Sequence, residues 1–314
     1  MTADLSRAHD AARDAARAIA AAALGRDPGP MAAAESSSHQ VYVGPDAVVK
    51  LIDSASHTRL DRETALAPHL PAGLTAPLLG SGVHRLETGE VRYACYARVP
   101  GTAPGMGMPG ADAATARALA GEAVERLGRL HQWVPAGPAD RTLREVPDHG
   151  GFTGRAVLLA DVEGLAAADR NGTVPSRLLD GLRTIAEHAP AQARTDVPVH
   201  ADCHWDNWLA RGRSVTALLD FEWARFGEPL DDWFFLARFS GPHMETVLDV
   251  IARATGTPPE ALRAGCEVRE AAHLAADLRL ALEHPGVHTG MAADRLRSLE
   301  ELVVGRYWWS GGLA

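Results

Sequence analysis

The chain has 314 residues, 46% of them hydrophobic, and a formal net charge of −9. This length and apolar content suffice for a full core in one large domain or two packed lobes. The acidic balance argues against a nucleic-acid binder, whose surface would be basic, and no run approaches the 18 or more apolar residues of a membrane span. The three cysteines form no Cys-x-x-Cys pair, which favours a reducing cytoplasm over a disulfide framework or a structural zinc site.

The first hundred residues are predicted to form a helix followed by a small sheet. Residues 5–24 are rich in Ala with dispersed charges, which is typical of a helix. Further along, the alternation of apolar residues and the turn residues predict strands at 40–43, around Lys50, at 77–83 and at 91–99, and a helix at 58–70. The Gly- and Pro-rich segment 101–109 is the clearest break in composition. We therefore predict an N-terminal domain of residues 1–100 and a C-terminal domain of residues 101–314.

Beyond that break the chain is predicted to be mostly helical. The stretch 135–174 is rich in Gly and Pro, and we expect a loop-rich insertion on the substrate side there. His131, at the end of the first of these helices, is expected to be a packed histidine. The helices are predicted at residues 112–134, 175–189, 230–239, 243–255, 258–284 and 291–308.

A single lysine stands among the 31 basic residues, and the other 30 are arginines. Lys50 lies in V-V-K-L-I, a β-branched apolar run that predicts a buried strand. A buried lysine needs a partner or a function. We therefore predict that Lys50 has a function. The alternative is a surface lysine whose stem alone is buried.

The strongest functional pattern lies in residues 199–222. It contains H-x-D-x4-N, formed by His200, Asp202 and Asn207, and an apolar strand that ends at Asp220. Phosphoryl transfer needs a group that orients and deprotonates a hydroxyl, and oxygen ligands that hold Mg²⁺. We therefore predict Asp202 as the catalytic base and Asn207 and Asp220 as metal ligands. The alternative, a simple turn network, explains neither the spacing nor the second acidic position.

This stretch resembles the aminoglycoside phosphotransferase and choline-kinase-like branch of the protein-kinase-like fold. The resemblance extends to G-E-P-L-D-D at residues 227–232, which is similar to the family's G-D-P-x-x-D, and Asp232 would brace the catalytic loop. Asp220 opens D-F-E in place of the D-F-G of protein kinases, while the family's usual H-G-D is H-A-D here. The resemblance implies a two-lobed α+β fold with a small antiparallel sheet lobe and a larger, mostly helical C-terminal lobe.

The resemblance also implies most of the nucleotide contacts. In kinase-like folds the third strand carries a lysine that contacts the α- and β-phosphates of ATP, and the resemblance implies this role for Lys50. Glu63, in the predicted helix 58–70, would pair with it. Ser37 and Ser38 belong to a serine run that stands where protein kinases have a Gly-rich loop, and their hydroxyl and N–H groups could meet phosphate oxygens. Taken alone, such a run is more often a solvated loop.

The segment C-Y-A-R-V-P-G at residues 95–101 resembles the family's hinge between the lobes. There the carbonyl of Arg98 and the N–H of Val99 would hold the edge of the adenine base. The implied cofactors are ATP or GTP as phosphoryl donor, and Mg²⁺.

The acceptor side is the least defined. Four of the seven tryptophans stand in or just after the catalytic region, where aromatic residues can wall a pocket, although they more often belong to the core. Acidic residues among them could meet ammonium groups. The candidate substrate contacts are Trp205, Asp206, Glu222, Trp223, Glu228 and Asp231.

We expect a cytoplasmic enzyme that moves the γ-phosphoryl group of ATP or GTP to a hydroxyl of a small molecule. An aminoglycoside-like compound or another antibiotic or natural product is the first candidate acceptor. Two alternatives stay open, namely a choline- or thiamine-type amino alcohol and a Ser or Thr of a peptide in natural-product biosynthesis. A catalytically inactive binding module is disfavoured, because the base, metal and lysine positions are all filled.

Overall fold

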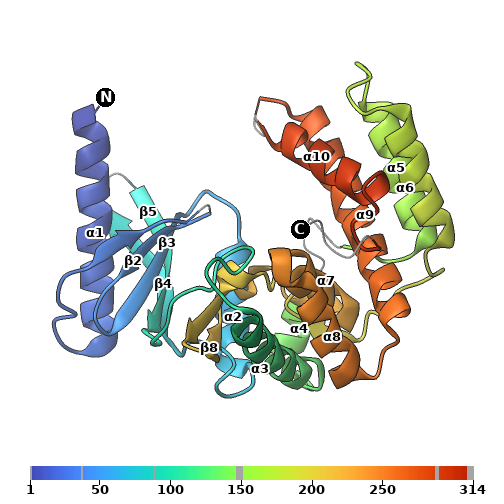
Figure 1. Ribbon diagram of the computed structural model, residues 1–314. Helices are drawn as coiled ribbons and strands as arrows, with labels where there is room; N and C mark the ends of the chain where they lie inside the picture. Colours follow the sequence, from blue (N-terminus) through green and yellow to red (C-terminus); the bar gives the residue numbers. More distant parts are fainter. Residues whose placement is uncertain (1, 37, 88, 146–150, 287–289, 310–314) are drawn as a thin grey trace.

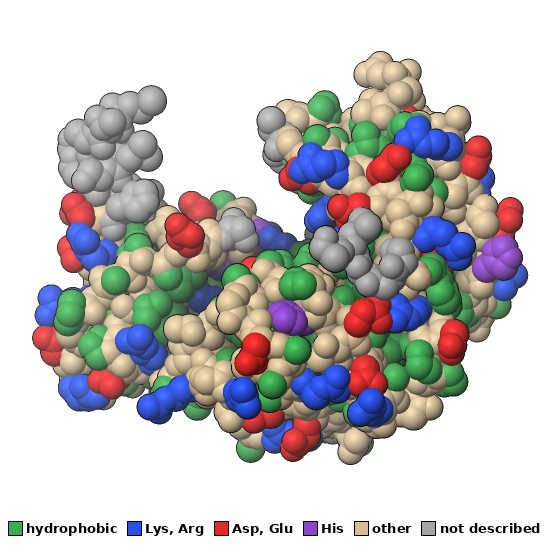
Figure 2. All heavy atoms as spheres, viewed as in Figure 1, with side chains coloured by type: hydrophobic (Ala, Val, Ile, Leu, Met, Phe, Trp, Pro, Cys, Tyr) green, Lys and Arg blue, Asp and Glu red, His purple; other side chains and the backbone are tan. Residues whose placement is uncertain are grey.

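The computed structural model describes residues 2–36, 38–87, 89–145, 151–286 and 290–309. These residues form two lobes, a sheet lobe at the N-terminus and a mostly helical lobe at the C-terminus (Figure 1). The two-lobed α+β fold that the sequence predicts is therefore confirmed. The space-filling view shows a deep hollow between the sheet lobe and the helices at the C-terminal end (Figure 2). Within the described residues, no helix is long and apolar enough to cross a membrane.

The sheet lobe contains five antiparallel strands in the spatial order β1-β2-β3-β5-β4. Side chains alternate between the two faces of a strand, so Val49 and Leu51 of β3 pack against helix α1 while Lys50 lies on the opposite face. The bounds are α1 Thr2–Leu24, β1 Ala32–Ala34, β2 Gln40–Val43, β3 Ala47–Asp53, β4 Leu78–Leu86 and β5 Gly89–Ala97.

Helix α2 (Arg59–Leu66) crosses the face of the sheet that carries Lys50. Its buried Leu60 packs with Ile52 and Ala94 of the sheet. The helix tightens into the 3-10 turn η1 (Ala67–His69), where Pro68 lacks the N–H that a further α-turn needs. This packing brings the buried Glu63 of α2 to the sheet face.

The helical lobe surrounds one large core, in which Trp205, Trp208 and Trp308 are fully buried. Two short antiparallel pairs, β6 with β9 and β7 with β8, flank the segment with the H-x-D-x4-N pattern, which lies between β6 and β7. The elements are α3 Ala113–His131, α4 Pro138–Arg144, α5 Arg155–Ala168, α6 Ser176–His188, β6 Val197–Val199, η2 Trp205–Asn207, β7 Trp208–Arg211, β8 Ser214–Leu218, η3 Phe221–Trp223, β9 Arg225–Gly227, α7 Pro229–Arg238, η4 Gly241–His243, α8 Met244–Thr255, α9 Pro259–Glu283 and α10 Met291–Val303.

The two lobes meet where residues 98–112 run between β5 and α3. Thr102 and Ala210 exchange two backbone hydrogen bonds of 3.0 and 2.9 Å. Gly101 has a φ of +140°, and a Cβ there would lie 2.9 Å from both Ala210 O and Thr216 Oγ1. Only glycine allows this close approach. The predicted domain boundary at 100/101 lies in this segment and stays a prediction.

Two sequence expectations were wrong. The stretch 135–174 contains α4 and α5 rather than a long loop, because Leu158, Val162 and Leu165 lie on one face of α5 and are buried. The Gly and Pro residues that suggested a loop lie around α4 and α5 and largely outside them. Helix α10 ends at Val303 rather than at 308, since Gly305 N–H closes the last turn onto Glu300 O and Arg306 turns left-handed with a φ of +48°.

Candidate active site

Lys50 lies at the centre of an ionic group on the inner face of the sheet. Its Nζ donates to Glu63 Oε2 at 2.8 Å and Oε1 at 3.1 Å, and lies 3.3 Å from Asp220 Oδ1. Burial by itself lowers the pKa of the ammonium, but the charges of Glu63 and Asp220 outweigh it and raise that pKa above its ordinary value. The ammonium therefore stays charged in a buried position. Lys50 and Glu63 form the ion pair that the family resemblance implies.

Asp202 lies in the loop between β6 and η2. Asn207 Nδ2 donates to its backbone oxygen at 2.8 Å and to its Oδ2 at 3.3 Å, and His204 Nε2 lies 3.6 Å from its Oδ1. Burial raises the pKa of Asp202 well above its ordinary value, and the negative charge of Asp220 raises it further. A carboxylate with a raised pKa accepts a proton from a hydroxyl more readily. This arrangement suits the general base that the sequence predicts.

His200 holds the two carboxylates in a fixed relation. Its Nε2 contacts Leu219 O at 2.8 Å and its Nδ1 contacts the N–H of Asp202 at 3.2 Å. Because a carbonyl only accepts and an N–H only donates, the proton resides on Nε2. Burial lowers the pKa of His200, which keeps the ring neutral. The ring thus joins the residue before Asp220 to Asp202.

Asp232 braces the same loop from the first turns of α7. Its carboxylate accepts hydrogen bonds from the N–H of His200 at 3.1 Å and of Ala201 at 2.7 Å, and His131 Nε2 lies 2.8 Å away. Burial alone would raise the pKa of Asp232, but the hydrogen bond and charge of His131 lower it. Ala201 has a φ of +63°, a left-handed conformation that costs a non-glycine residue about 1–2 kcal/mol.

Oxygen donors for a divalent cation gather around Asp220. The carboxylates of Glu63, Asp220 and Glu222 lie within 4.8 Å of one another. Asn207 turns its Nδ2 towards Asp202, which makes Oδ1 the atom of its amide that is suited to a cation. Carboxylate and amide oxygens are the donors that Mg²⁺ takes beside phosphates. The residues present therefore fit Mg²⁺, with Asn207 and Asp220 as the predicted ligands.

An apolar slot of about 240 Å³ opens between the lobes beside Lys50. Valines of β2 and β3 form one wall, and leucines of the helical lobe form the other. Arg98 and Val99 lie at its edge, where the sequence places the hinge, and the N–H of Arg98 donates to Asp46 O at 2.9 Å. The slot is lined by Val41, Val43, Val48, Lys50, Glu63, Thr75, Ala76, Tyr96, Ala97, Arg98, Val99, Gly101, Leu209 and Leu219.

The serine segment ahead of β2 is linked through His39 to Glu222. Ser37 lies outside the described residues, while the hydroxyl of Ser38 lies 2.8 Å from Nδ1 of His39. Nε2 of His39 faces Glu222 Oε1 at 2.8 Å, an ion-pair distance that lacks hydrogen-bond geometry. Arg59 Nε lies 3.8 Å from the other oxygen of Glu222. Sequence reasoning missed His39, whose one signal is that it directly follows the serines.

Lys50, the predicted base Asp202 and the predicted metal ligands Asn207 and Asp220 thus lie close together, as phosphoryl transfer would require. The profile described as "Phosphotransferase enzyme family" matches residues 31–267, more than half of the chain. The chain belongs to the phosphotransferase enzyme family. It is a phosphotransferase, and the resemblance found in its sequence is confirmed. A comparison with curated protein sequences found no match.

Solved structures show the same fold as this phosphotransferase. The GDP complex of aminoglycoside 2'-phosphotransferase-IIIa has a TM-score of 0.71 at 18% identity, covering 89% of this chain and 94% of that one. A ternary complex of aminoglycoside phosphotransferase APH(4)-Ia with ADP and hygromycin B gives 0.62 at 20% identity, with 92% and 97% covered. Macrolide 2'-phosphotransferase type I gives 0.60 at 17% identity, with 95% and 97% covered.

The predicted substrate contacts of the phosphotransferase do not gather at one place. Asp231 is buried and ion-paired to Arg225 and Arg269, and Glu228 also pairs with Arg269, so neither offers a free carboxylate. Glu222 is buried, and its carboxylate lies within 4.8 Å of those of Glu63 and Asp220.

The two tryptophans differ in their surroundings. Trp205 is fully buried and donates from Nε1 to Ser240 Oγ at 2.8 Å, so the prediction of a substrate contact was wrong for it. Trp223 is half-buried with the guanidinium of Arg59 over its ring. Asp206 is exposed beside the catalytic loop and accepts the N–H of Met106 at 3.1 Å. Asp206 and Trp223 remain predictions.

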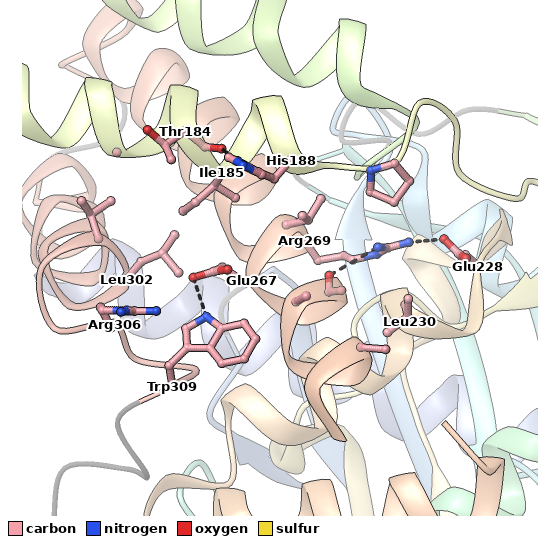
Figure 3. Close-up of a pocket in the computed structure, with 17 residues that line it drawn as sticks. Thr184, Ile185, His188, Glu228, Leu230, Glu267, Arg269, Leu302, Arg306 and Trp309 are labelled. Atoms are coloured by element: carbon pink, nitrogen blue, oxygen red, sulfur yellow. Dashed lines mark hydrogen bonds and ion pairs between the residues drawn. The ribbon is translucent and has the colours of Figure 1, made fainter. Parts of the chain in front are cut away.

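Figure 3 shows a larger hollow, of about 670 Å³, between α6, α9, α10 and the start of α7. Arg269 crosses it to reach Glu228, and Trp309 donates to Glu267 at its other end. None of Lys50, Asp202 and Asp220 lines this hollow. It is therefore separate from the active site of the phosphotransferase.

Proposed function

We propose that this phosphotransferase moves the γ-phosphoryl group of ATP or GTP to a hydroxyl of a small molecule, with Mg²⁺ as cofactor. The observation that carries the proposal is the charged Lys50 held between Glu63 and Asp220, beside an apolar slot between the lobes. The slot suits a purine base, with Arg98 and Val99 at its edge. A charged ammonium at the end of such a slot suits the α- and β-phosphates. Ser37 and Ser38 are the proposed phosphate contacts of the loop.

In the proposed reaction Asp202 accepts the proton of the acceptor hydroxyl. The oxygen of that hydroxyl forms a bond to the γ-phosphorus at the same time. The bond from the γ-phosphorus to the bridging oxygen breaks, and the nucleoside diphosphate leaves with that electron pair. Lys50 holds the α- and β-phosphates during this step, and Asn207 and Asp220 would hold the metal ion. Bound Mg²⁺ would neutralise negative charge on the phosphates. Asp232 and His200 act by keeping Asp202 in place.

The acceptor class rests on the structural relatives. They include a complex with GDP and kanamycin, a complex with ADP and hygromycin B, and a macrolide 2'-phosphotransferase. These support an antibiotic or related natural product as acceptor, and none of them supports a peptide. A cytoplasmic setting, which supplies nucleoside triphosphates, is part of the proposal, and the buried free thiols of Cys95, Cys203 and Cys266 suit it.

The experiment is a measurement of nucleoside diphosphate release from ATP and from GTP, with Mg²⁺ and a panel of acceptors. The panel should contain aminoglycosides, macrolides, neutral glycosides, choline and a Ser/Thr peptide. We expect release to depend on one of the small molecules, with the phosphorylated product detected by mass spectrometry. Binding of neither nucleotide in the presence of Mg²⁺ would contradict the proposal.

A further inference from the structure

A small pocket of about 120 Å³ lies between α7, α9 and α10. Two successive contacts, through His204, link it to Asp202. His204 Nε2 lies 3.6 Å from Asp202 Oδ1, and the ring of His204 lies 5.9 Å, centroid to centroid, from that of Phe239, which lines the pocket. A molecule with its hydroxyl at Asp202 can therefore extend over His204 towards this pocket. We call it the aryl pocket, defined by Phe235, Phe239, His273 and Leu274.

The walls of the aryl pocket are aromatic rings. Phe235 and Phe239, four residues apart on one face of α7, stack with their centroids 6.0 Å apart and their planes at 21°. His273 of α9 meets Phe235 edge-on at 5.2 Å. All three side chains are half-buried, so part of each ring is open to a ligand. Offset and edge-on ring contacts favour the binding of a further flat ring.

The charges around the aryl pocket cancel. Glu270 accepts from Arg238 Nε at 2.5 Å and from Trp308 Nε1 at 2.6 Å. Asp277 accepts from Arg295 Nε at 2.6 Å. The two arginines and the two carboxylates that line the pocket therefore sum to zero. A polycationic acceptor finds no surplus of negative charge among these residues, and breaking a buried ion pair to create one is costly.

We propose that the acceptor carries an uncharged aromatic or similarly flat apolar group, which enters the aryl pocket while its hydroxyl lies at Asp202. The pocket, at about 120 Å³, is somewhat smaller than the roughly 150 Å³ cavity that is known to bind benzene, so it limits the group to at most one ring. This inference rests on the proposed function and names the acceptor class of that same site. It separates an aryl-bearing alcohol from the amino-rich acceptors that the sequence suggests.

The test compares the binding of three hydroxyl-bearing probes to the full chain saturated with Mg²⁺ and the ATP analogue AMP-PNP. The probes are 4-nitrophenyl β-glucoside, methyl β-glucoside and kanamycin, measured by isothermal titration calorimetry. We expect the nitrophenyl glucoside to bind at least ~10-fold more tightly than the methyl glucoside, equivalent to about 1.4 kcal/mol, and kanamycin to bind no more tightly than the methyl glucoside. Equal binding of the two glucosides, tightest binding of kanamycin, or no binding of the nitrophenyl glucoside would overturn the inference.

Two variants locate the effect. Phe235→Ala should bring the ratio between the two glucosides close to one, and Phe239→Leu, which keeps the apolar volume but removes the ring, should reduce it. Phe226→Ala is the matched control, because Phe226 of β9 lies outside the aryl pocket and stacks with Arg144; it should keep the wild-type ratio. Loss of the ratio in Phe226→Ala and its retention in Phe235→Ala would place the aryl group elsewhere.

The affinity of the wild-type chain for AMP-PNP, measured alone, separates the two proposals. If the analogue does not bind, the proposed function fails. If it binds and the glucosides do not differ, only the aryl pocket fails.

Discussion

The nucleotide half of the cleft and the acceptor half are built in opposite ways. In the nucleotide half, the charges of Lys50, Glu63 and Asp220 are brought together from β3, α2 and the end of β8 and are concentrated near one point. In the proposed acceptor half, each carboxylate of the aryl pocket has an arginine partner, and the rings of Phe235, Phe239 and His273 line the pocket beside these ion pairs. The first half suits a charged phosphate chain, and the second suits an uncharged group.

This difference explains why the two halves are not equally visible in a sequence. Phosphates and a metal ion impose fixed residue types on short segments, so the nucleotide half has motifs. An apolar acceptor pocket can be formed by many combinations of side chains on helix faces. Its residues, Phe235, Phe239 and His273, are spread over two helices and follow no motif.

The largest effect is expected from the base. Asp202→Asn removes the group that accepts the hydroxyl proton, and turnover should fall at least ~100-fold, a typical general-base contribution. The affinity for nucleotide should barely change, since the nucleotide half stays intact. Steady-state kinetics with the fastest acceptor of the panel measures the first quantity and calorimetry the second. Asp196→Asn, an exposed aspartate paired with Arg194, is the matched control and should keep wild-type turnover.

A smaller effect is expected from Lys50→Arg, which keeps the charge but changes its shape. The planar guanidinium is too broad for the space between Glu63 and Asp220 and would misplace the phosphates. We expect kcat/KM for the nucleotide to fall at least ~10-fold, which equals about 1.4 kcal/mol of transition-state binding. The chain has no second lysine to act as control, so circular dichroism and the melting temperature must show that the variant is folded. Wild-type kinetics would mean that Lys50 does not contact phosphate.

The smallest effect is expected at the catalytic loop itself. Ala201→Gly relieves a left-handed alanine, and after allowance for the greater freedom of glycine in the unfolded chain the gain should be about 0.5–1 kcal/mol in the free energy of unfolding. Turnover should stay close to that of the wild type, because Asp232 still binds the backbone N–H. Urea denaturation measures the change. The same substitution at the buried Ala217 of β8 should destabilise instead, and a loss of stability at both positions would show that Ala201 is not strained.

Much of the fold could be predicted because its elements have strong local signals. The strand at 40–43 and the helices at 176–188 and 244–255 agree with the sequence patterns to within one residue. Helix α5 was missed, since the Gly and Pro residues around α4 and α5 masked the regular spacing of Leu158, Val162 and Leu165. Burial of Leu158, Val162 and Leu165 against α6 and α9 decides that segment, and sequence spacing alone does not reveal those partners.

The candidate site could also be predicted only in part. The ion pair between Lys50 and Glu63 could be predicted from the sequence. The chain has a single lysine, which lies in an apolar strand, and the family resemblance indicates its partner. Trp205 was a candidate ligand contact because aromatic residues beside a catalytic loop can wall a pocket, yet its ring is fully buried in the core. The contact between His39 and Glu222 joins residues far apart in the sequence, and no local pattern indicates it.

The most direct test of the central claim is the Mg²⁺-dependent rise in melting temperature that AMP-PNP produces, compared between the wild-type chain and Asp220→Ala. Asp220 is the predicted metal ligand that also faces Lys50, and ligand binding raises stability in proportion to the logarithm of ligand concentration over Kd. We predict a clear rise in the wild type and in the control Asp196→Ala, and no Mg²⁺-dependent rise in Asp220→Ala. An undiminished Mg²⁺-dependent rise in folded Asp220→Ala would contradict the assignment of the metal site.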